Sequence, residues 1–412
     1  MRFKYIRLSA MMFLQFFVFG CTLPIFSLYM KDYLHFSGAQ SGIILAMSAI
    51  PAFFAPLISS FIADRLISAE RLLICCNIAG AAAMSALYFQ SEFYSVLFFY
   101  LLYSLLTGPA IALTTAITFH HAPEAVKKFG GIRLWGTLGW FMAAWVFRYL
   151  WSAKETAEIL RSALALSAFS SVILSIYAST LPLGLKRNKQ VKVVLFPGDS
   201  LRVVLQPEIL IFSLISILIT FADRFYMFGG APFLKHLGFT DRQILPVLSF
   251  GQIPEIIGLG VLGIMLKKFG LKKTLLLGAF FEISRFLIFL SGDRNLLYLG
   301  ISLHGFTYSY FFIPLTMFLD TRCDKYSRAG VHQLFSMIAG IGAFAGNLFA
   351  GLVADLATTN ALNQIDFSRF WLVALLFSVA AFSGILFFTS EQEISTVTAT
   401  ELKPQESAIS RN

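Results

Sequence analysis

Charged residues are scarce in this chain of 412 residues, and their scarcity excludes a soluble protein. Aspartate, glutamate, lysine and arginine make up 13% of the sequence, whereas about 25% is typical of soluble domains. Hydrophobic residues make up 57%, and the mean hydropathy is +0.75. A soluble globule of this composition would lack the polar side chains needed to cover its surface. We therefore expect most of the chain to lie in a membrane.

Signatures of catalysis are missing as well. The four cysteines, Cys21, Cys75, Cys76 and Cys323, have neither metal-ligand spacing nor the pattern of a secreted disulfide framework, so we expect them to be packing residues. The sequence contains neither HExxH nor GxSxG, and it has no phosphate-binding loop. We therefore expect no enzyme activity, no cofactor and no bound metal.

Long apolar blocks are present instead. A helix that rises about 1.5 Å per residue needs roughly 20 residues to cross a hydrocarbon core about 30 Å thick. Strands of an outer-membrane barrel would alternate over about ten residues, and these blocks do not. The fold class predicted is an all-α membrane protein with about twelve transmembrane helices. The predicted spans are 8–30, 41–62, 72–90, 94–118, 133–152, 158–181, 207–229, 241–265, 274–291, 295–319, 329–354 and 366–389.

Basic residues collect in alternate loops, and this asymmetry predicts the orientation of the chain. Cytoplasmic loops of membrane proteins carry an excess of lysine and arginine. An even number of spans puts both termini on one side, and that side holds most of the basic residues, including Arg7, Lys127, Lys186, Lys267 and Arg328. We predict a multi-pass membrane protein with both termini cytoplasmic. Topology then explains the net charge of +10, and no nucleic-acid partner is expected.

One long polar connection divides the predicted spans into six and six. Two repeats joined by a central linker are typical of secondary transporters, in which one repeat rocks against the other around the solute. The predicted domains are an N-terminal six-helix half, a cytoplasmic linker, a C-terminal six-helix half and a disordered cytoplasmic tail, at 1–183, 184–206, 207–390 and 391–412. The basic loop LGIMLKKFGLKK, residues 262–273, occupies the position in the second half that Asp64 and Arg65 occupy in the first.

Three residues of the fifth predicted span share one face. Arg133, Thr137 and Trp140 are spaced i, i+4 and i+7. An ionisable side chain inside a span is costly, so each one is a candidate functional group. A guanidinium, a hydroxyl and an aromatic ring on one face could bind a flat, hydrogen-bonding solute. The alternative is that Arg133 only extends to the cytoplasmic interface.

The second half carries more ionisable residues. Gln252 and Glu255 are spaced i, i+3, and Pro254 between them loosens the local helix. A carboxyl group inside a span can bind and release a proton, which makes Glu255 the predicted proton carrier. The alternative is a structural ion pair between Glu255 and Arg285. For Glu282 and Arg285, also spaced i, i+3, an intrahelical ion pair is predicted.

Asp223 and Arg224 are neighbours in the seventh predicted span. Neighbouring residues of a helix point about 100° apart, whereas Asp223 and Tyr226 share a face. We therefore expect Asp223 and Tyr226 on the wall of a cavity, and Arg224 turned towards a neighbouring helix. A lone histidine in the tenth span, His304, is predicted to be a hydrogen-bonded packing residue.

Several stretches resemble the nucleoside:proton symporters of the major facilitator superfamily. The longest is GIRLWGTLGWFMAAWVF, residues 131–147; LQFFVFG in the first span, GQIPE at 251–255 and HGFTYSYFF at 304–312 support it. The resemblance implies a major facilitator fold and proton-coupled import of nucleosides. It also implies that the family's binding residues fall on Arg133, Thr137, Trp140, Gln252 and Glu255.

The chain departs from that family on one wall of the implied pocket. Asp223 and Tyr226 replace amide side chains, Tyr308 and Ser309 replace a phenylalanine and an aspartate, and His304 replaces a tyrosine. A different heterocycle or a modified sugar is therefore open as the substrate.

Together these patterns and the resemblance predict a monomeric, proton-coupled importer of nucleosides that works by alternating access in the lipid bilayer of a bacterial inner membrane. Glu255 and Asp223 are the residues predicted to couple protons. An oligosaccharide or small aromatic-acid symporter is the alternative within transport, and a receptor or scaffold without transport is the alternative outside it. The predicted substrate-binding residues are Arg133, Thr137, Trp140, Asp223, Tyr226, Gln252, Glu255 and Tyr308.

Overall fold

The computed structural model describes residues 2–54, 67–121, 129–150, 158–182, 198–323, 328–359 and 364–388. The predicted tail and most of the predicted linker lie outside these residues, as do Asp64 and Arg65. The division into two halves at 183 and 207 therefore stays a prediction. Within the predicted linker, residues 198–204 form a short helix.

Helices make up nearly all of the described chain. The helices of the first part are α1 (Arg2–Thr22), α2 (Phe26–Asp32), α3 (Gly38–Ala46), the 3-10 helix η1 (Met47–Ala49), α5 (Ala69–Tyr88), α6 (Phe93–His121), α7 (Phe129–Leu150) and α8 (Glu158–Ser179). Those of the second part are α9 (Gly198–Val204), α10 (Pro207–His236), α11 (Asp241–Ser249), α12 (Gln252–Ser291), α13 (Leu297–Thr307), the π-helix η3 (Tyr308–Phe312), α14 (Ile313–Thr321), α15 (Arg328–Leu356) and α16 (Phe367–Phe388). A small antiparallel hairpin, β1 (Thr358–Thr359) and β2 (Gln364–Ile365), lies between α15 and α16.

Eight helices within the described residues are long and apolar enough to cross a membrane. One of them, Asp241–Ser291, contains two of the predicted spans, 241–265 and 274–291. Gly270 lies between these spans and has a φ of 75°, so it interrupts the helix α12 at that point. The predicted spans 133–152 and 295–319 are helical too, as α7 and as α13 to α14. The prediction of an all-α membrane protein is confirmed.

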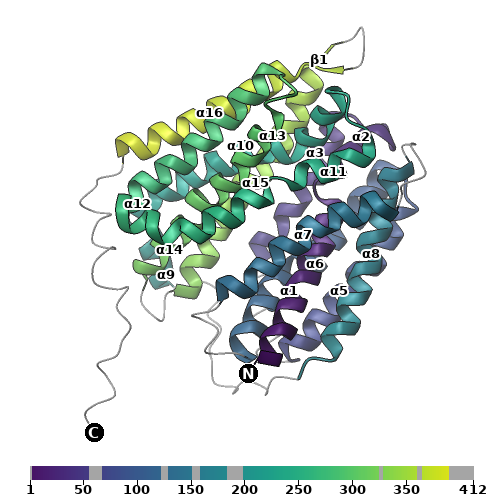
Figure 1. Ribbon diagram of the computed structural model, residues 1–412, viewed down its shortest axis with the longest axis horizontal. Coiled ribbons are helices and arrows are strands. Elements are labelled where there is room, and N and C mark those ends of the chain that lie inside the picture. The colour runs from purple at the N-terminus through teal and green to yellow at the C-terminus, as the bar shows by residue number, and fades with distance from the viewer. Residues whose placement is uncertain are drawn as a thin grey trace.

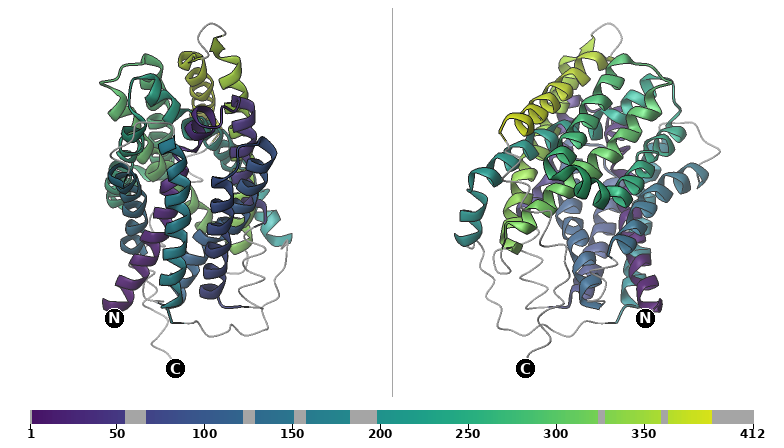
Figure 2. Two further views of the ribbon diagram at one scale, coloured as in Figure 1. Left: turned by 90° about the vertical axis from the view of Figure 1, so that its right-hand side faces the viewer. Right: turned by 60° about the vertical axis from the view of Figure 1, so that its left-hand side comes forward.

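The helices form two groups that lie side by side (Figure 1). In the first group α1 packs against α7 and α8, and α5 packs against α6 and α8. In the second, α10 packs against α15 and α16, and α12 packs against α13 and α16. The N-terminus lies at one end of the molecule, and α2, α3 and β1 lie at the other, as the views of Figures 1 and 2 agree. At that far end α3 packs against α15 and α2 packs against α10, so the two groups meet there.

Glycines bring α1 and α7 together. A Cβ atom at Gly139 would lie 2.9 Å from the carbonyl carbon of Phe13, and one at Gly20 would lie 2.9 Å from Cα of Trp140. Both distances are too short for a larger residue, so the two backbones touch as they do at small-residue interfaces of membrane helices. Gly136 and Gly139 of α7 therefore face α1, and the orientation of the opposite face of α7 follows from this contact.

A widened turn follows α13. Residues Tyr308–Phe312 form the π-helix η3, a rare conformation that is frequent at functional sites. The Ser309 hydroxyl donates hydrogen bonds to the carbonyl oxygens of Glu255 and Gly305, both at 3.0 Å. These bonds hold the first turn of α12 against η3.

Candidate functional site

A cavity of about 390 Å³ lies between the two groups of helices. All eight residues predicted to bind the substrate line it, although they come from three separate helices and the π-helix. They are Arg133, Thr137 and Trp140 of α7, Asp223 and Tyr226 of α10, Gln252 and Glu255 of α12, and Tyr308 of η3. The remaining lining residues are Phe16, Pro24, Thr220, Arg224, Met227, Leu248, His304, Phe312 and Ala339.

Arg133 faces this cavity from the first group. Its guanidinium carbon lies 4.0 Å from the centre of the Phe16 ring, which is a cation–π distance. A Cβ atom at Gly136 would lie 2.9 Å from Arg133 Nη1, so the glycine leaves the space that the guanidinium occupies. Nη1 is buried and has no hydrogen-bond partner among the described residues. An arginine that only extended to the membrane surface would place this group in water, so the interfacial alternative does not describe Arg133.

Thr137 and Glu255 connect the two groups across the cavity. The Thr137 hydroxyl donates a hydrogen bond to Glu255 Oε1 at 3.2 Å, and only 7% of Glu255 is exposed. The alternative partner for Glu255 was Arg285, but Arg285 is bonded to Glu282 instead. The predicted intrahelical pair of Glu282 and Arg285 is therefore confirmed, and both residues are fully buried.

Asp223 lies in a cluster of charged groups. Its Oδ2 accepts a hydrogen bond from Arg224 Nη2 at 2.6 Å. Its Oδ1 lies 3.4 Å from His304 Nδ1 and 3.8 Å from Arg285 Nη2. His304 Nδ1 and Arg285 Nη1 are 2.7 Å apart, so the neutral imidazole would accept from the guanidinium. Three cationic or potentially cationic side chains thus surround one carboxylate.

The prediction that Arg224 turns away from the cavity is wrong. Its Cβ does point towards α15, where it would lie 2.9 Å from a Cβ atom at Gly346. The long side chain then folds back, bonds Asp223 and lines the cavity. A helix-face argument locates Cβ atoms, and a flexible arginine can carry its charge away from that direction.

His304 also lies on the cavity wall rather than only in the packed interior. Its ring centre is 4.9 Å from that of Tyr226, and the Arg285 guanidinium carbon lies 4.5 Å from the centre of Tyr226. The signal available in the sequence was its place four residues before Tyr308, which puts both on one helical face. Phe16, Met227 and Leu248 carry no such signal, because apolar residues are abundant in every span.

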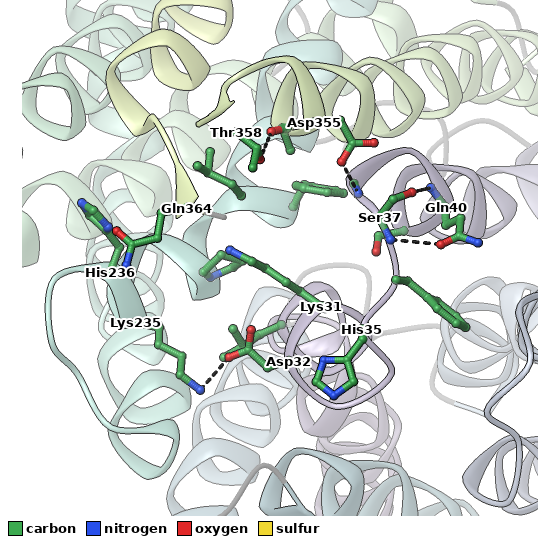
Figure 3. Close-up of a pocket in the computed structure, with 18 of the residues that line it drawn as sticks. Lys31, Asp32, His35, Ser37, Gln40, Lys235, His236, Asp355, Thr358 and Gln364 are labelled. Carbon is green, nitrogen blue, oxygen red and sulfur yellow. Dashed lines mark hydrogen bonds and ion pairs between the residues drawn. The ribbon is translucent and has the colours of Figure 1, made fainter. Parts of the chain in front are cut away.

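A second cavity, of about 950 Å³, is lined by residues of α2, α3, α10 and α15. Of these helices, α2 and α3 lie at the end of the molecule far from the N-terminus (Figure 1). Figure 3 shows its polar side chains, which come from both groups of helices. Lys235 bonds Asp32 at 2.6 Å and Asp241 at 2.8 Å. Asp355 accepts hydrogen bonds from the backbone of Gly38 and Ala39. These contacts tie α2 and α3 to α10 and α15.

Within the described ranges, no group of three or more histidine, cysteine, aspartate or glutamate side chains is placed to hold a metal ion. The cavity between the groups offers hydrogen-bond donors, acceptors and aromatic faces. Such a lining suits an uncharged, flat solute with polar edges.

Comparisons with known proteins point to one family. A family model described as nucleoside H+ symporter matches residues 1–393. The putative nucleoside transporter YegT of Escherichia coli is 28% identical over 409 residues, which cover 95% of each chain. The xanthosine permease of Escherichia coli is 27% identical over 403 residues, 93% of this chain and 94% of the permease. A crystal structure of the nucleoside transporter NupG superposes with a TM-score of 0.82 at 24% identity, covering 93% of this chain and 98% of that one.

Proposed function

Because this chain belongs to the nucleoside H+ symporter family, we propose that the cavity of about 390 Å³ binds a nucleoside and a proton together. The protein is a secondary transporter of the major facilitator fold that imports nucleosides by alternating access. It is a multi-pass membrane protein. We propose further that it acts as a monomer in a bacterial inner membrane with both termini cytoplasmic.

One observation carries the assignment of the site: all eight predicted residues line a single cavity between the two groups. Trp140, Tyr226 and Tyr308 offer aromatic faces on which a nucleobase can stack. Arg133 and Gln252 supply polar groups for the edges of the base or the sugar. Glu255 is the proposed proton carrier, because it is a buried carboxyl group on the cavity and contacts the opposite group of helices through Thr137.

The proposed orientation assigns each of the two cavities a role in the transport cycle. With the N-terminal end cytoplasmic, the contacts of α2 and α3 with α10 and α15 close the outer face. Asn347 adds to this closure by donating a hydrogen bond to the carbonyl of Leu45 at 3.2 Å. The structure then corresponds to a carrier closed to the outside, and the larger cavity is an outer vestibule.

Uptake of labelled uridine into cells that produce the protein tests the function. Unlabelled uridine, inosine and adenosine should compete with it, and lactose and phenylpropionate should not. A protonophore should abolish accumulation. Competition by lactose or phenylpropionate without competition by nucleosides would favour an oligosaccharide or aromatic-acid symporter instead.

A further inference from the structure

Helix α3 begins with two backbone N–H groups that neither the helix nor its capping box satisfies. The first N–H groups of any helix lack partners within the helix. Ser37 and Gln40 form a capping box: the Ser37 hydroxyl accepts from the Gln40 N–H at 3.1 Å, and Gln40 Oε1 accepts from the Ser37 N–H at 3.0 Å. The N–H groups of Gly38 and Ala39 remain, and they point out of the end of the helix.

A carboxylate from the other group of helices takes up both of these donors. Asp355, in the last turn of α15, accepts from Gly38 N at 2.6 Å through Oδ1 and from Ala39 N at 2.7 Å through Oδ2. Figure 3 shows the Asp355 carboxylate directed at the start of α3. Charge-assisted bonds of this length are stronger than neutral ones, and the N-terminal end of a helix favours a negative charge.

The backbones beside this contact touch because both helices carry glycine. A Cβ atom at Gly42 would lie 3.0 Å from Cα of Gly351 and 2.7 Å from the carbonyl oxygen of Asn347. A Cβ atom at Gly351 would lie 2.8 Å from Cα of Gly42. A side chain at either glycine would therefore push α3 and α15 apart.

We propose that Asp355 is a latch between the two groups of helices: its carboxylate caps α3 when the outer face is closed and releases it when that face opens. In this role Asp355 is a positioning residue that sets the balance between closed and open outer faces without touching the substrate. Opening must break two charge-assisted hydrogen bonds and separate the glycine contact at once. The glycines make the capping geometry possible, because a larger residue would hold the carboxylate too far from Gly38 and Ala39.

The chain contains a matched control for this chemistry. Asp366 also caps a helix, accepting from Ser368 N at 3.0 Å and Arg369 N at 3.3 Å, but both donors belong to α16 in its own group. Loss of that cap should weaken α16 locally and leave the contact between α3 and α15 in place. A comparison of Asp355→Asn with Asp366→Asn therefore distinguishes a latch between the two groups of helices from the loss of any helix cap.

The test measures how often the outer face opens. Leu248 lines the cavity between the groups, so Leu248→Cys, with the four native cysteines replaced, reports access from outside to a membrane-impermeant maleimide added to whole cells. Asp355→Asn should raise the labelling rate roughly fivefold or more, since it removes one acceptor and the charge. Gly351→Ala should raise the labelling rate as well, because the added Cβ atom would push α3 and α15 apart. Asp366→Asn should leave the labelling rate unchanged.

Uptake gives an independent readout. If the outward-open state is the rarer one, a larger population of it lowers the external concentration of nucleoside that gives half-maximal uptake. Asp355→Asn should show this shift and Asp366→Asn should not. Unchanged labelling in Asp355→Asn, whatever Gly351→Ala does, or an equal rise in Asp366→Asn, would overturn the latch. The labelling assay needs no nucleoside, so its result stands even if the proposed substrate is wrong.

Discussion

The Thr137 hydroxyl lies 3.2 Å from Glu255 Oε1 and joins α7 to α12 across the cavity. A hydrogen bond to an ionised carboxylate is stronger than one to a neutral carboxyl group. Protonation of Glu255 therefore changes the strength of a contact between the two groups of helices. Coupling of proton binding to a conformational change requires a contact between the two groups of helices whose strength depends on protonation.

Thr137→Val removes the hydroxyl while keeping the branched shape. We expect the initial rate of uridine uptake driven by an acidic exterior to fall about tenfold, which corresponds to the loss of one charge-assisted hydrogen bond. Thr137→Ser keeps the hydroxyl and should stay within about twofold of the wild type. Proteoliposomes with an imposed pH gradient provide the measurement. Equal losses in the two variants would show that the bond to Glu255 plays no part.

Arg133→Ala should weaken nucleoside binding by about one to two decades, because a charged hydrogen bond contributes roughly 1.5 to 3 kcal/mol. Isothermal titration of the purified protein with uridine measures the change. Arg148→Ala is the control, since Arg148 lies in the last turn of the same helix and outside the cavity. Wild-type affinity in Arg133→Ala would mean that the guanidinium does not contact the substrate.

Asp223 retains one oxygen, Oδ1, that is buried and has no hydrogen-bond partner among the described residues. A ribose hydroxyl that donates to it would gain a charged acceptor. Asp223→Asn should therefore weaken uridine about tenfold and 2′-deoxyuridine much less. Uptake of both ligands by the variant gives the ratio. Equal losses would remove the idea of hydroxyl recognition, and lost coupling with binding intact would make Asp223 the proton carrier.

Arg285 should matter for stability more than for binding. It is fully buried, bonds Glu282 and lies over the Tyr226 ring. Removing one partner of a buried pair costs about 3 to 5 kcal/mol, because it leaves an uncompensated charge. Arg285→Met should lower the midpoint of thermal unfolding strongly, whereas Arg369→Met, at a side chain that is 75% exposed, should change it little. Equal midpoints would show that the buried cluster does not stabilise the fold.

The apolar blocks were enough to predict the fold class, because the bilayer dictates the length of a spanning helix. The interruptions were harder to foresee. The first predicted span, 8–30, is broken between Thr22 and Phe26 at Pro24, and the tenth contains the π-helix. At the second deviation the Ser309 hydroxyl bonds the carbonyl oxygen of Glu255 in another helix, a tertiary contact that no local pattern contains.

The faces of single helices were also predictable, since Arg133, Thr137 and Trp140 follow helical spacing and do line one cavity. What spacing could not give is how a long side chain bends or which helices meet. Arg224 returns to the cavity through a bond to its neighbour Asp223. Asp355 meets the start of α3 although 317 positions separate it from Gly38.

Glu255→Gln tests the central claim most directly. The amide keeps the shape of the side chain and can still accept from Thr137, but it cannot carry a proton. Proteoliposomes loaded with unlabelled uridine should therefore still exchange it for labelled uridine. The same vesicles under an inward proton gradient should fail to accumulate uridine above the external concentration. Accumulation against the uridine gradient by Glu255→Gln, abolished by a protonophore, would contradict the assignment of Glu255 as the proton carrier.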